Sequence, residues 1–319
     1  MSQTESSAPS SDGVLIVGSI TADLTTFSQR LPARGETILG DDFTLVLGGK
    51  GANQAVAASL AGGAARMVAC VGNDLFSELV TSGLRDAGVN IDQVRKVDGR
   101  TGIAHIRVDD SGENDIVMVP LANAALSEAQ IDTAFAEYGA VSKVLLSQLE
   151  IPWALTQHAI RRGHEAGLTV VLDPAPAAIL DEAIWPLVDI VTPNETEATI
   201  LTGIRVHDQD SAVQAGRWFT SRGARYALIT LAAAGAVLVS DDTVAVFASI
   251  PVTAVDTTAA GDAFAGYLGA SLALGYALPD AIDRAMAAGA LSVTKRGASP
   301  SLPLRVDVDA LLQAQKAAV

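Results

Sequence analysis

The sequence predicts an α/β protein: a doubly wound, mostly parallel sheet flanked by helices, with a small β-sheet lid. Short apolar runs typical of buried parallel strands alternate with helical patterns over most of the 319 residues. Two segments, about 24–48 and 101–119, interrupt this alternation with short strands of mixed polarity. We expect them to pair into a small sheet that stands off the main domain. Its apolar face must be covered by substrate closure or by another subunit.

The first strand is predicted at 14–17, because Val14-Leu15-Ile16-Val17 is an apolar run that ends at Gly18. Similar runs predict strands at 66–72, 91–97, 143–149, 169–172, 189–192 and 226–230, and a hairpin at 236–240 and 243–248. Helical spacing of apolar residues predicts a helix running to about 60, and others at 75–87, 127–138, 152–166, 208–221, 262–274, 279–294 and 306–316. A turn at 109–112 joins the two strands of the second lid segment. The Ser-rich residues 1–11 are predicted to be a disordered tail before a domain at 12–319.

Composition limits the classes of function open to the chain. The formal charge of −15 disfavours nucleic acid or an anionic membrane as the main partner, because both reward basic patches. A single cysteine, Cys70, excludes an internal disulfide framework and a Cys-rich zinc site. No apolar run reaches the length needed to span a bilayer, and the first residues lack the apolar core of a secretion signal. We therefore expect a cytoplasmic protein that binds neither nucleic acid nor membrane.

The segment 255–266, VDTTAAGDAFAG, holds a carboxylate among small residues at the start of a helical pattern. Small residues let backbone N–H groups approach a ligand, and a helix N-terminus favours a phosphate. A carboxylate there, Asp262, is useful if it takes a proton from a hydroxyl that attacks a bound phosphoryl group. An acidic residue in a first turn can also merely favour the helix dipole. The segment by itself leaves both interpretations open.

A second Gly-rich segment, 48–54 (GGKGANQ), precedes another helical pattern. Its glycines are expected to offer bare backbone to a ligand, and Lys50 and Asn53 add a cation and an amide that could bind hydroxyls. A flexible connector would explain the glycines but not these two side chains. The segment is not a P-loop, since no Gly-Lys-Ser/Thr closes a run of the right spacing.

Polar residues follow several predicted strands, where the carboxyl ends of parallel strands should form one cleft. They are Asp23, Glu150, Asp173, Asn194 and Glu197. Asn194 and Glu197 are three residues apart, so one helical turn places them on the same side. Their oxygens could help to hold Mg²⁺, which keeps several waters and takes few protein ligands. A helix N-cap with acidic first-turn residues explains this pair equally simply, and without further context it is the favoured interpretation.

Four motifs carry a resemblance to a known family. They are 18–23 (GSITAD), 48–55 (GGKGANQA), 192–197 (TPNETE) and 256–262 (DTTAAGD). In order and spacing they are similar to those of the ribokinase (PfkB) family of carbohydrate kinases, and they resemble its ribokinase branch more than its fructokinase or adenosine kinase branches. The similarity extends from about 13 to 315. The second and fourth motifs are the specific ones.

The resemblance implies an ATP-dependent sugar kinase that phosphorylates the primary (5-) hydroxyl of a pentose, with D-ribose to ribose 5-phosphate as the first candidate. Asp262 would be the base, and Ala259, Ala260 and Gly261 would form an anion hole with it. Sugar contacts would come from Thr21, Asp23, Gly49, Lys50, Gly51, Asn53, Glu150 and Asp262. ATP contacts would come from Asn194, Thr230, Leu231, Ala232, Ala233, Ala234, Gly235, Gly261 and Met286. Mg²⁺ would lie near Asn194 and Glu197, and K⁺ among Asp256, Thr258, Ser292, Lys295, Gly297 and Ser301. A homodimer through the lid sheets is also implied.

Two residues depart from the family pattern. Thr21 stands where ribokinases carry Asn, and Thr lacks the paired donor and acceptor of an amide. This admits another sugar or a nucleoside, such as deoxyribose, a ketose, uridine or adenosine. Ala232 stands where a Gly is usual in the nucleotide loop, so a positive φ there would strain it and affect the choice of phosphate donor.

The alternative from another functional class is a catalytically silent sugar-binding regulator. The histidines, His207 among them, are expected at the surface rather than in catalysis.

Overall fold

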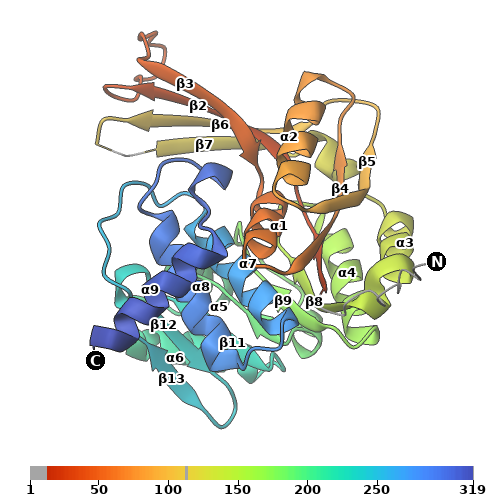
Figure 1. The fold of residues 1–319 in the computed structure, drawn as a ribbon, viewed down its shortest axis with the longest axis vertical. Coiled ribbons are helices and arrows are strands. Elements are labelled where there is room, and N and C mark those ends of the chain that lie inside the picture. Colours follow the sequence, from red (N-terminus) through yellow and green to blue (C-terminus); the bar gives the residue numbers. More distant parts are fainter. Residues whose placement is uncertain (1–12, 112–113, 319) are drawn as a thin grey trace, which may run out of the picture.

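A computed structural model describes residues 13–111 and 114–318 of the chain. These residues form two β-sheets, one of nine strands and one of four (Figure 1). The predicted tail at 1–11 lies outside the described residues, and so does Gly112 at the tip of the predicted turn. The predicted fold class is confirmed.

The large sheet is parallel except for one antiparallel strand. In sheet order its strands are β13 (Val244–Phe247), β12 (Ala236–Val239), β11 (Tyr226–Thr230), β10 (Ile190–Val191), β9 (Thr169–Leu172), β8 (Ser142–Ser147), β1 (Gly13–Val17), β4 (Ala64–Val71) and β5 (Asn90–Lys96). Only β12 runs against its neighbours. The chain moves from β1 outward to β4 and β5, then returns to place β8 on the other side of β1. This reversal creates a crevice at the carboxyl ends of β1 and β8, where open α/β sheets bind ligands.

Helices cover both faces of this sheet, because successive strand residues point to opposite sides. Val14 and Ile16 of β1 belong to one hydrophobic cluster, and Leu15 and Val17 belong to the other. The first cluster includes residues of α1 (Lys50–Leu60), α2 (Leu75–Asp86), α7 (Ala260–Ala273), α8 (Leu278–Ser292) and α9 (Arg305–Ala318). The second includes residues of α3 (Glu128–Tyr138), α4 (Trp153–Glu165), α5 (Glu195–Thr202) and α6 (Gln209–Thr220). Short 3₁₀ helices lie at Leu121–Ala125, Gly139–Val141, Glu182–Leu187, Ala232–Ala234 and Ser299–Ser301.

The small sheet joins the two segments that interrupt the β/α alternation. Its order is β3 (Asp42–Gly48), β2 (Thr21–Ser28), β6 (Gly102–Asp109) and β7 (Asn114–Val119). The central β2–β6 pair is parallel, and the two outer pairs are antiparallel. In Figure 1 this sheet projects from the main body. Because β2 begins at Thr21, earlier than the expected 24, Asp23 lies inside this sheet at its base.

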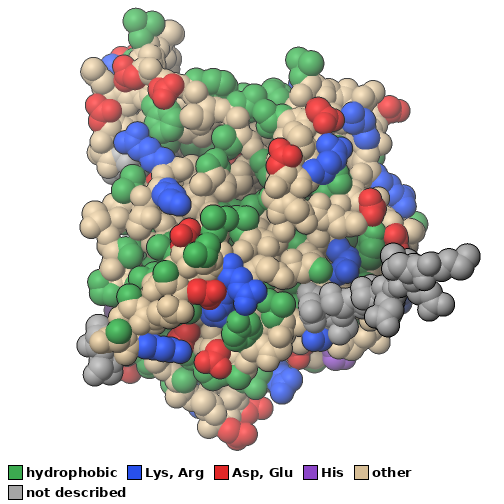
Figure 2. Space-filling model, in the orientation of Figure 1, with side chains coloured by type: hydrophobic (Ala, Val, Ile, Leu, Met, Phe, Trp, Pro, Cys, Tyr) green, Lys and Arg blue, Asp and Glu red, His purple; other side chains and the backbone are tan. Residues whose placement is uncertain are grey.

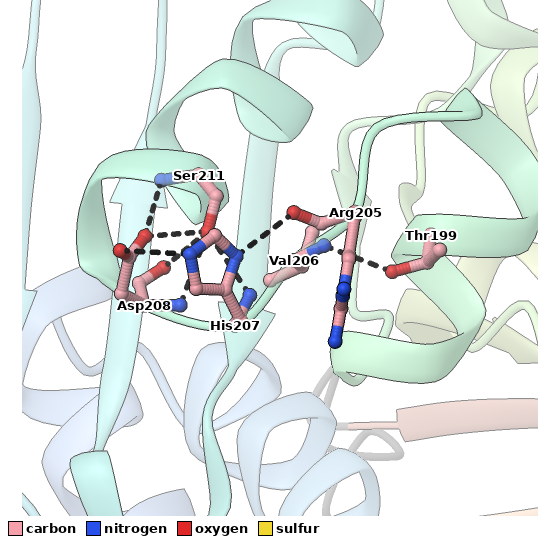
Figure 3. A network of polar contacts seen from close by, with 6 residues as sticks. All are labelled: Thr199, Arg205, Val206, His207, Asp208 and Ser211. Atoms are coloured by element: carbon pink, nitrogen blue, oxygen red, sulfur yellow. Dashed lines mark hydrogen bonds and ion pairs between the residues drawn. The ribbon is translucent and has the colours of Figure 1, made fainter.

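The connection between α5 and α6 shows how a surface histidine is accommodated (Figure 3). Asp208 caps α6 by accepting a hydrogen bond from the backbone N–H of Ser211 at 2.8 Å. His207 is exposed, and its Nε2 lies 3.3 Å from the Asp208 carboxylate. The hydroxyl of Thr199 accepts from the backbone N–H of Val206 at 3.0 Å. The expectation that His207 is a surface residue is confirmed.

The outer surface carries charges of both signs. On the face drawn in Figure 2, Lys and Arg side chains are scattered among Asp and Glu side chains. Over the part of the chain that the structure describes, none of the helices combines the length and apolarity that crossing a bilayer requires.

A close contact between α1 and α7 brings together the two Gly-rich segments of the sequence. At Gly266 of α7, an added Cβ would lie 2.5 Å from the Cβ of Ala57 and 2.6 Å from the carbonyl oxygen of Gln54. Only a glycine allows the two helix backbones to approach this far. The starts of both helices therefore lie at the same edge of the large sheet.

We predict that Gly266→Ala lowers the free energy of unfolding by about 1–3 kcal/mol, because the added methyl overpacks the α1–α7 contact. Urea unfolding measures this change. Gly289→Ala in α8 is the matched control, since its Cβ would find only ordinary contacts, the nearest at 3.5 Å. A helix-interior Gly→Ala change without a clash keeps or raises stability. Equal stability of the two variants would contradict the prediction.

Candidate active site

Polar side chains collect at the carboxyl edge of the large sheet, as the strand-end residues predict. Ser19 follows β1, Gln148 and Glu150 follow β8, Asp173 follows β9, Asn194 follows β10, and Thr230 ends β11. Helices α1 and α7 begin at the same edge and add Lys50, Asn53, Gln54 and Asp262. The resulting site spans the point where the strand order reverses.

Two side-chain amides from α1 hold the carboxylate of Asp262. Asn53 Nδ2 donates to Oδ2 at 2.9 Å, and Gln54 Nε2 donates to Oδ1 at 3.2 Å. Asp262 is buried in the first turn of α7, only 5% exposed. The structure therefore joins the second and fourth sequence motifs in direct contact.

The candidate sugar residues surround this carboxylate from two other elements. Thr21 Oγ1 donates to Asp23 Oδ1 at 2.6 Å, and both residues are buried. Burial raises the pKa of Asp23 to about 6, although the hydrogen bond from Thr21 opposes the shift. Glu150 Oε2 accepts from the Ser19 hydroxyl at 2.5 Å and from the backbone N–H of Lys50 at 2.8 Å. Each of these carboxylates is thus fixed by a short polar contact.

The glycines at 48, 49 and 51 have a packing role that the sequence did not predict. An added Cβ at Gly48 would lie 2.0 Å from the Asp23 carboxylate, and one at Gly51 would lie 2.5 Å from the Ser19 nitrogen. Gly49 has a φ of +87°, a conformation that favours glycine. The missing side chains therefore let this segment pack on the β1–β2 connection. That the same glycines also offer backbone to a ligand stays a prediction.

Lys50 is the half-buried cation among these carboxylates. Burial alone would lower the pKa of Lys50, but nearby carboxylates, led by that of Asp262, raise it above its usual range. Asp173 lies deeper. Burial raises the pKa of Asp173 well above its usual range, while the charge of Lys50 acts in the opposite direction. The lysine therefore stays charged and partly balances a site rich in negative charge.

A cavity of about 770 Å³ adjoins the start of α7. Seven of the predicted ATP-contacting residues line it: Asn194, Thr230, Ala232, Ala233, Gly235, Gly261 and Met286. Leu231 and Ala234 do not line it; Leu231 is buried in the core instead. The lining also includes apolar Ile250, Pro251 and Val252. A mostly apolar cavity with a few polar groups is typical of a small-molecule site.

Two non-glycine residues beside this cavity have positive φ angles. Ala232 has a φ of +43° and Ala259 has a φ of +60°. L-residues disfavour this region by roughly 1–2 kcal/mol. The strain expected for Ala232 at a position where Gly is usual is therefore present, and local strain of this kind clusters at functional sites.

The N-terminus of α7 is open toward the cavity. Among the described residues, no side chain caps this helix, whose N-cap residue is Ala259. Ala260 and Gly261 line the cavity, and an added Cβ at Gly261 would meet nothing within 4 Å. First-turn N–H groups lack intrahelical partners and attract anions. This end of the helix can therefore receive a phosphate.

Asn194 and Glu197 form the helix cap that the sequence favoured. Asn194 Oδ1 accepts from the Glu197 N–H, and Glu197 Oε2 accepts from the Asn194 N–H, both at 2.9 Å. Burial raises the pKa of Glu197. Among the described residues there is no cluster of three His, Cys, Asp or Glu side chains that could hold a metal. Mg²⁺ at this place would depend on water and phosphate oxygens, as it commonly does.

The six residues proposed for K⁺ come from two segments, 256–258 and 292–301, that Asp256 connects. Its carboxylate accepts from the backbone N–H of Thr258 at 2.9 Å and of Gly297 at 2.8 Å. The Ser292 carbonyl accepts from the Lys295 N–H at 3.2 Å. The Ser301 hydroxyl donates to the Ala298 carbonyl at 2.8 Å. A carboxylate, backbone carbonyls and a hydroxyl form an oxygen-rich donor set that suits a hard cation.

Three buried residues of the site were missing from the sequence prediction. Ser19 holds Glu150, Gln54 holds Asp262, and Gln148 donates to Gln54 Oε1 at 2.5 Å. Their positions gave a signal, because Gln54 follows Asn53 in the second motif and Gln148 lies near the end of the strand predicted at 143–149. Their amide and hydroxyl groups do not ionise, so they add nothing to the charge pattern of the sequence.

Comparison with known proteins identifies the family. The family model described as pfkB family carbohydrate kinase matches residues 11–305. The chain belongs to this family. It is therefore a sugar kinase, as the four motifs predicted.

Ribokinase of Haemophilus influenzae is 39% identical over 291 residues, covering 91% of this chain and 95% of that protein. Deoxyribokinase of Salmonella typhi is 35% identical over 292 residues, covering 91% and 95%. The structure of Arabidopsis thaliana ribokinase complexed with ribose and ATP has a TM-score of 0.86 at 31% identity, covering 96% of this chain and 99% of that one.

We predict that Asp23→Asn makes this kinase more stable above pH 6. A buried carboxylate with a pKa near 6 binds its proton more tightly in the folded state than in the unfolded state, so its ionisation destabilises the fold as pH rises. Asn removes this charge and keeps an oxygen for Thr21. The gain at pH 8 is at most about 3 kcal/mol, since one pKa unit corresponds to about 1.4 kcal/mol. It should shrink between pH 6 and pH 4, which thermal unfolding at several pH values measures.

Asp74→Asn is the matched control. Burial opposes ionisation of Asp74, but hydrogen bonds from Thr101 and from first-turn amides of α2 outweigh it and lower the pKa. Loss of that charge should destabilise the protein at neutral pH, whereas Asp23→Asn should stabilise it. An Asp23→Asn variant less stable than the parent at pH 8 would contradict the prediction.

Proposed function

We propose that this kinase transfers the γ-phosphoryl group of ATP to the primary (5-) hydroxyl of a pentose, with D-ribose as the first candidate. One observation carries the proposal: the Asp262 carboxylate lies in the first turn of α7, whose uncapped N-terminus opens on the cavity. A proton acceptor and an anion site thereby share one helical turn. The similarity to ribokinases, among them one with ribose and ATP bound, supports the choice of substrates.

Asp262 is the general base in this proposal. It accepts the proton of the primary hydroxyl while the hydroxyl oxygen forms a bond to the γ-phosphorus and the bond to the β-γ bridging oxygen breaks, releasing ADP. The first-turn amides from Ala259 to Asp262 stabilise the negative charge on the transferred group. Mg²⁺ bound to ATP supplies further positive charge. Asn194 and Glu197 would hold it through water.

We predict that Asp262→Asn removes nearly all turnover, because the amide cannot accept the hydroxyl proton. General-base loss is expected to lower kcat by roughly 10²–10⁴-fold. Release of ADP from ATP and D-ribose, followed in a coupled assay, measures kcat, and calorimetry shows whether both ligands still bind. Turnover near that of the parent would refute the role of Asp262 as general base. A parent protein that binds sugar but releases no ADP with any sugar would instead indicate the silent regulator.

The identity of the sugar is proposed from the Thr21–Asp23 contact. The Thr21 hydroxyl donates its proton to Asp23, so it is not free to donate to a sugar hydroxyl as an amide would be. Relatives of comparable identity include both ribokinases and deoxyribokinases. This contact therefore makes a pentose with fewer hydroxyls a candidate substrate in addition to D-ribose.

We predict measurable turnover with both D-ribose and 2-deoxy-D-ribose. Thr21→Asn, which restores two amide donors, should raise kcat/KM for ribose relative to deoxyribose by roughly 5- to 10-fold, the value of one net hydrogen bond of about 1 kcal/mol. The coupled assay over a panel that includes fructose, uridine and adenosine measures this ratio. A preference for a nucleoside, or an unchanged ratio, would refute the assignment.

Two further features remain proposals. K⁺ bound between Asp256, Thr258 and the 292–301 loop would order the segment before α7 and strengthen the field at its N-terminus; activity in KCl against NaCl tests this. Homodimerisation through the small sheet would cover exposed Val117 and Phe43, which lie on the same face of that sheet. Light scattering tests it.

A further inference from the structure

Behind Asp262 lies a group of buried polar side chains that the proposed sugar and ATP contacts do not use. It consists of Gln54, Gln148 and Asp173, which are 0%, 0% and 7% exposed. They come from three elements, α1 and the segments after β8 and β9. Polar groups are seldom buried this completely without a specific hydrogen-bonding task.

Each polar atom of the Gln54 side chain is engaged. Nε2 donates to Asp173 Oδ2 at 2.7 Å and to Asp262 Oδ1 at 3.2 Å. Oε1 accepts from Gln148 Nε2 at 2.5 Å. The Asp262 carboxylate accepts hydrogen bonds and cannot donate one, so the NH₂ group must face it and the amide cannot turn over. Gln54 is therefore fixed in one orientation from three sides.

Stability alone gives a poor account of this arrangement. Gln148 Oε1 is buried without a hydrogen-bond partner among the described residues, and such an atom lowers stability. Burial of Asp173 adds a further unfavourable contribution, visible in its raised pKa. A core of apolar side chains of the same size would avoid both. What the arrangement supplies is a fixed donor directed at Asp262.

We propose that Gln54 is a positioning residue that holds the Asp262 carboxylate in its reactive orientation, and that Gln148 and Asp173 keep Gln54 in place. The inference rests on the proposed role of Asp262 as base. Gln54 holds Oδ1 and Asn53 holds Oδ2, so the carboxylate cannot rotate about its Cβ–Cγ bond. Gln54 is fully buried and reaches the reaction only through Asp262.

The test compares Gln54→Met with Gln130→Met. Methionine keeps the length of the side chain and removes its hydrogen bonds. Gln130 is also buried, and its Nε2 also donates two hydrogen bonds, to the carbonyls of Ala69 and Gln93 at 2.9 Å each. Both variants lose two donors from the interior, so thermal unfolding should show similar losses of stability. Only one of them loses a contact to Asp262.

The expected result is a split between kcat and KM. Gln54→Met should lower kcat by about 10- to 100-fold, the loss typical of a small misplacement of a reacting group. KM for sugar and for ATP should stay within about 2-fold of the parent, and Gln130→Met should keep the parent kcat. A Gln54→Met variant with the kcat of Gln130→Met would overturn the inference. So would a rise in the sugar KM at unchanged kcat, since Gln54 would then act in binding.

Gln148→Met tests the positioning role of Gln54 if Gln54→Met does not fold. It removes the donor to Gln54 Oε1 and leaves both carboxylate contacts available. A lower kcat at unchanged KM supports the inference, and an unchanged kcat overturns it. The Asp262→Asn variant keeps the two proposals apart. If Asp262→Asn is active, the base itself is wrong. If Asp262→Asn is inactive and both Gln54→Met and Gln148→Met have the kcat of Gln130→Met, only the positioning role is wrong.

Discussion

The close packing of α1 on α7 is the constraint on which the site depends. Gly266 lets the backbone of α7 approach the Gln54 carbonyl and Ala57, so that Asn53 and Gln54 at the start of α1 reach Asp262 at the start of α7. Residues more than 200 positions apart in the chain thereby form one hydrogen-bonded unit. A wider helix spacing would keep the fold and separate these groups. The alanine-rich composition of both helices has its physical reason here, since larger side chains would hold them apart.

The site concentrates negative charge that the fold must tolerate. Asp23, Asp173 and Glu197 all have raised pKa values because of burial, and Lys50 stays charged because carboxylates surround it. Such an arrangement is unfavourable for stability and useful for chemistry that moves a proton and a phosphoryl group. The positive φ angles of Ala232 and Ala259 add local strain at the same cavity. Both features are expected where a structure serves function at the expense of stability.

The sequence by itself determined the large-scale architecture and most of the candidate site. The β/α alternation, its two interruptions and the four motifs predicted both sheets, the strand-end residues and the family, because periodicity and turn chemistry are local properties. Helix α7 begins at Ala260, two residues before the predicted start, and Asp262 still falls in its first turn. The Asn194–Glu197 cap could likewise be predicted from the sequence, since a capping box depends on residues three apart.

The tertiary structure alone decided which groups touch. That the glycines at 48, 49 and 51 make room for Asp23, the Ile20–Thr21 backbone and Ser19 follows from distances between segments far apart in sequence. The same holds for the buried chain from Gln148 through Gln54 to Asp262. Hydrogen bonds between side chains of distant segments have no periodic signature in a sequence. They appear only when packing brings donor and acceptor within reach.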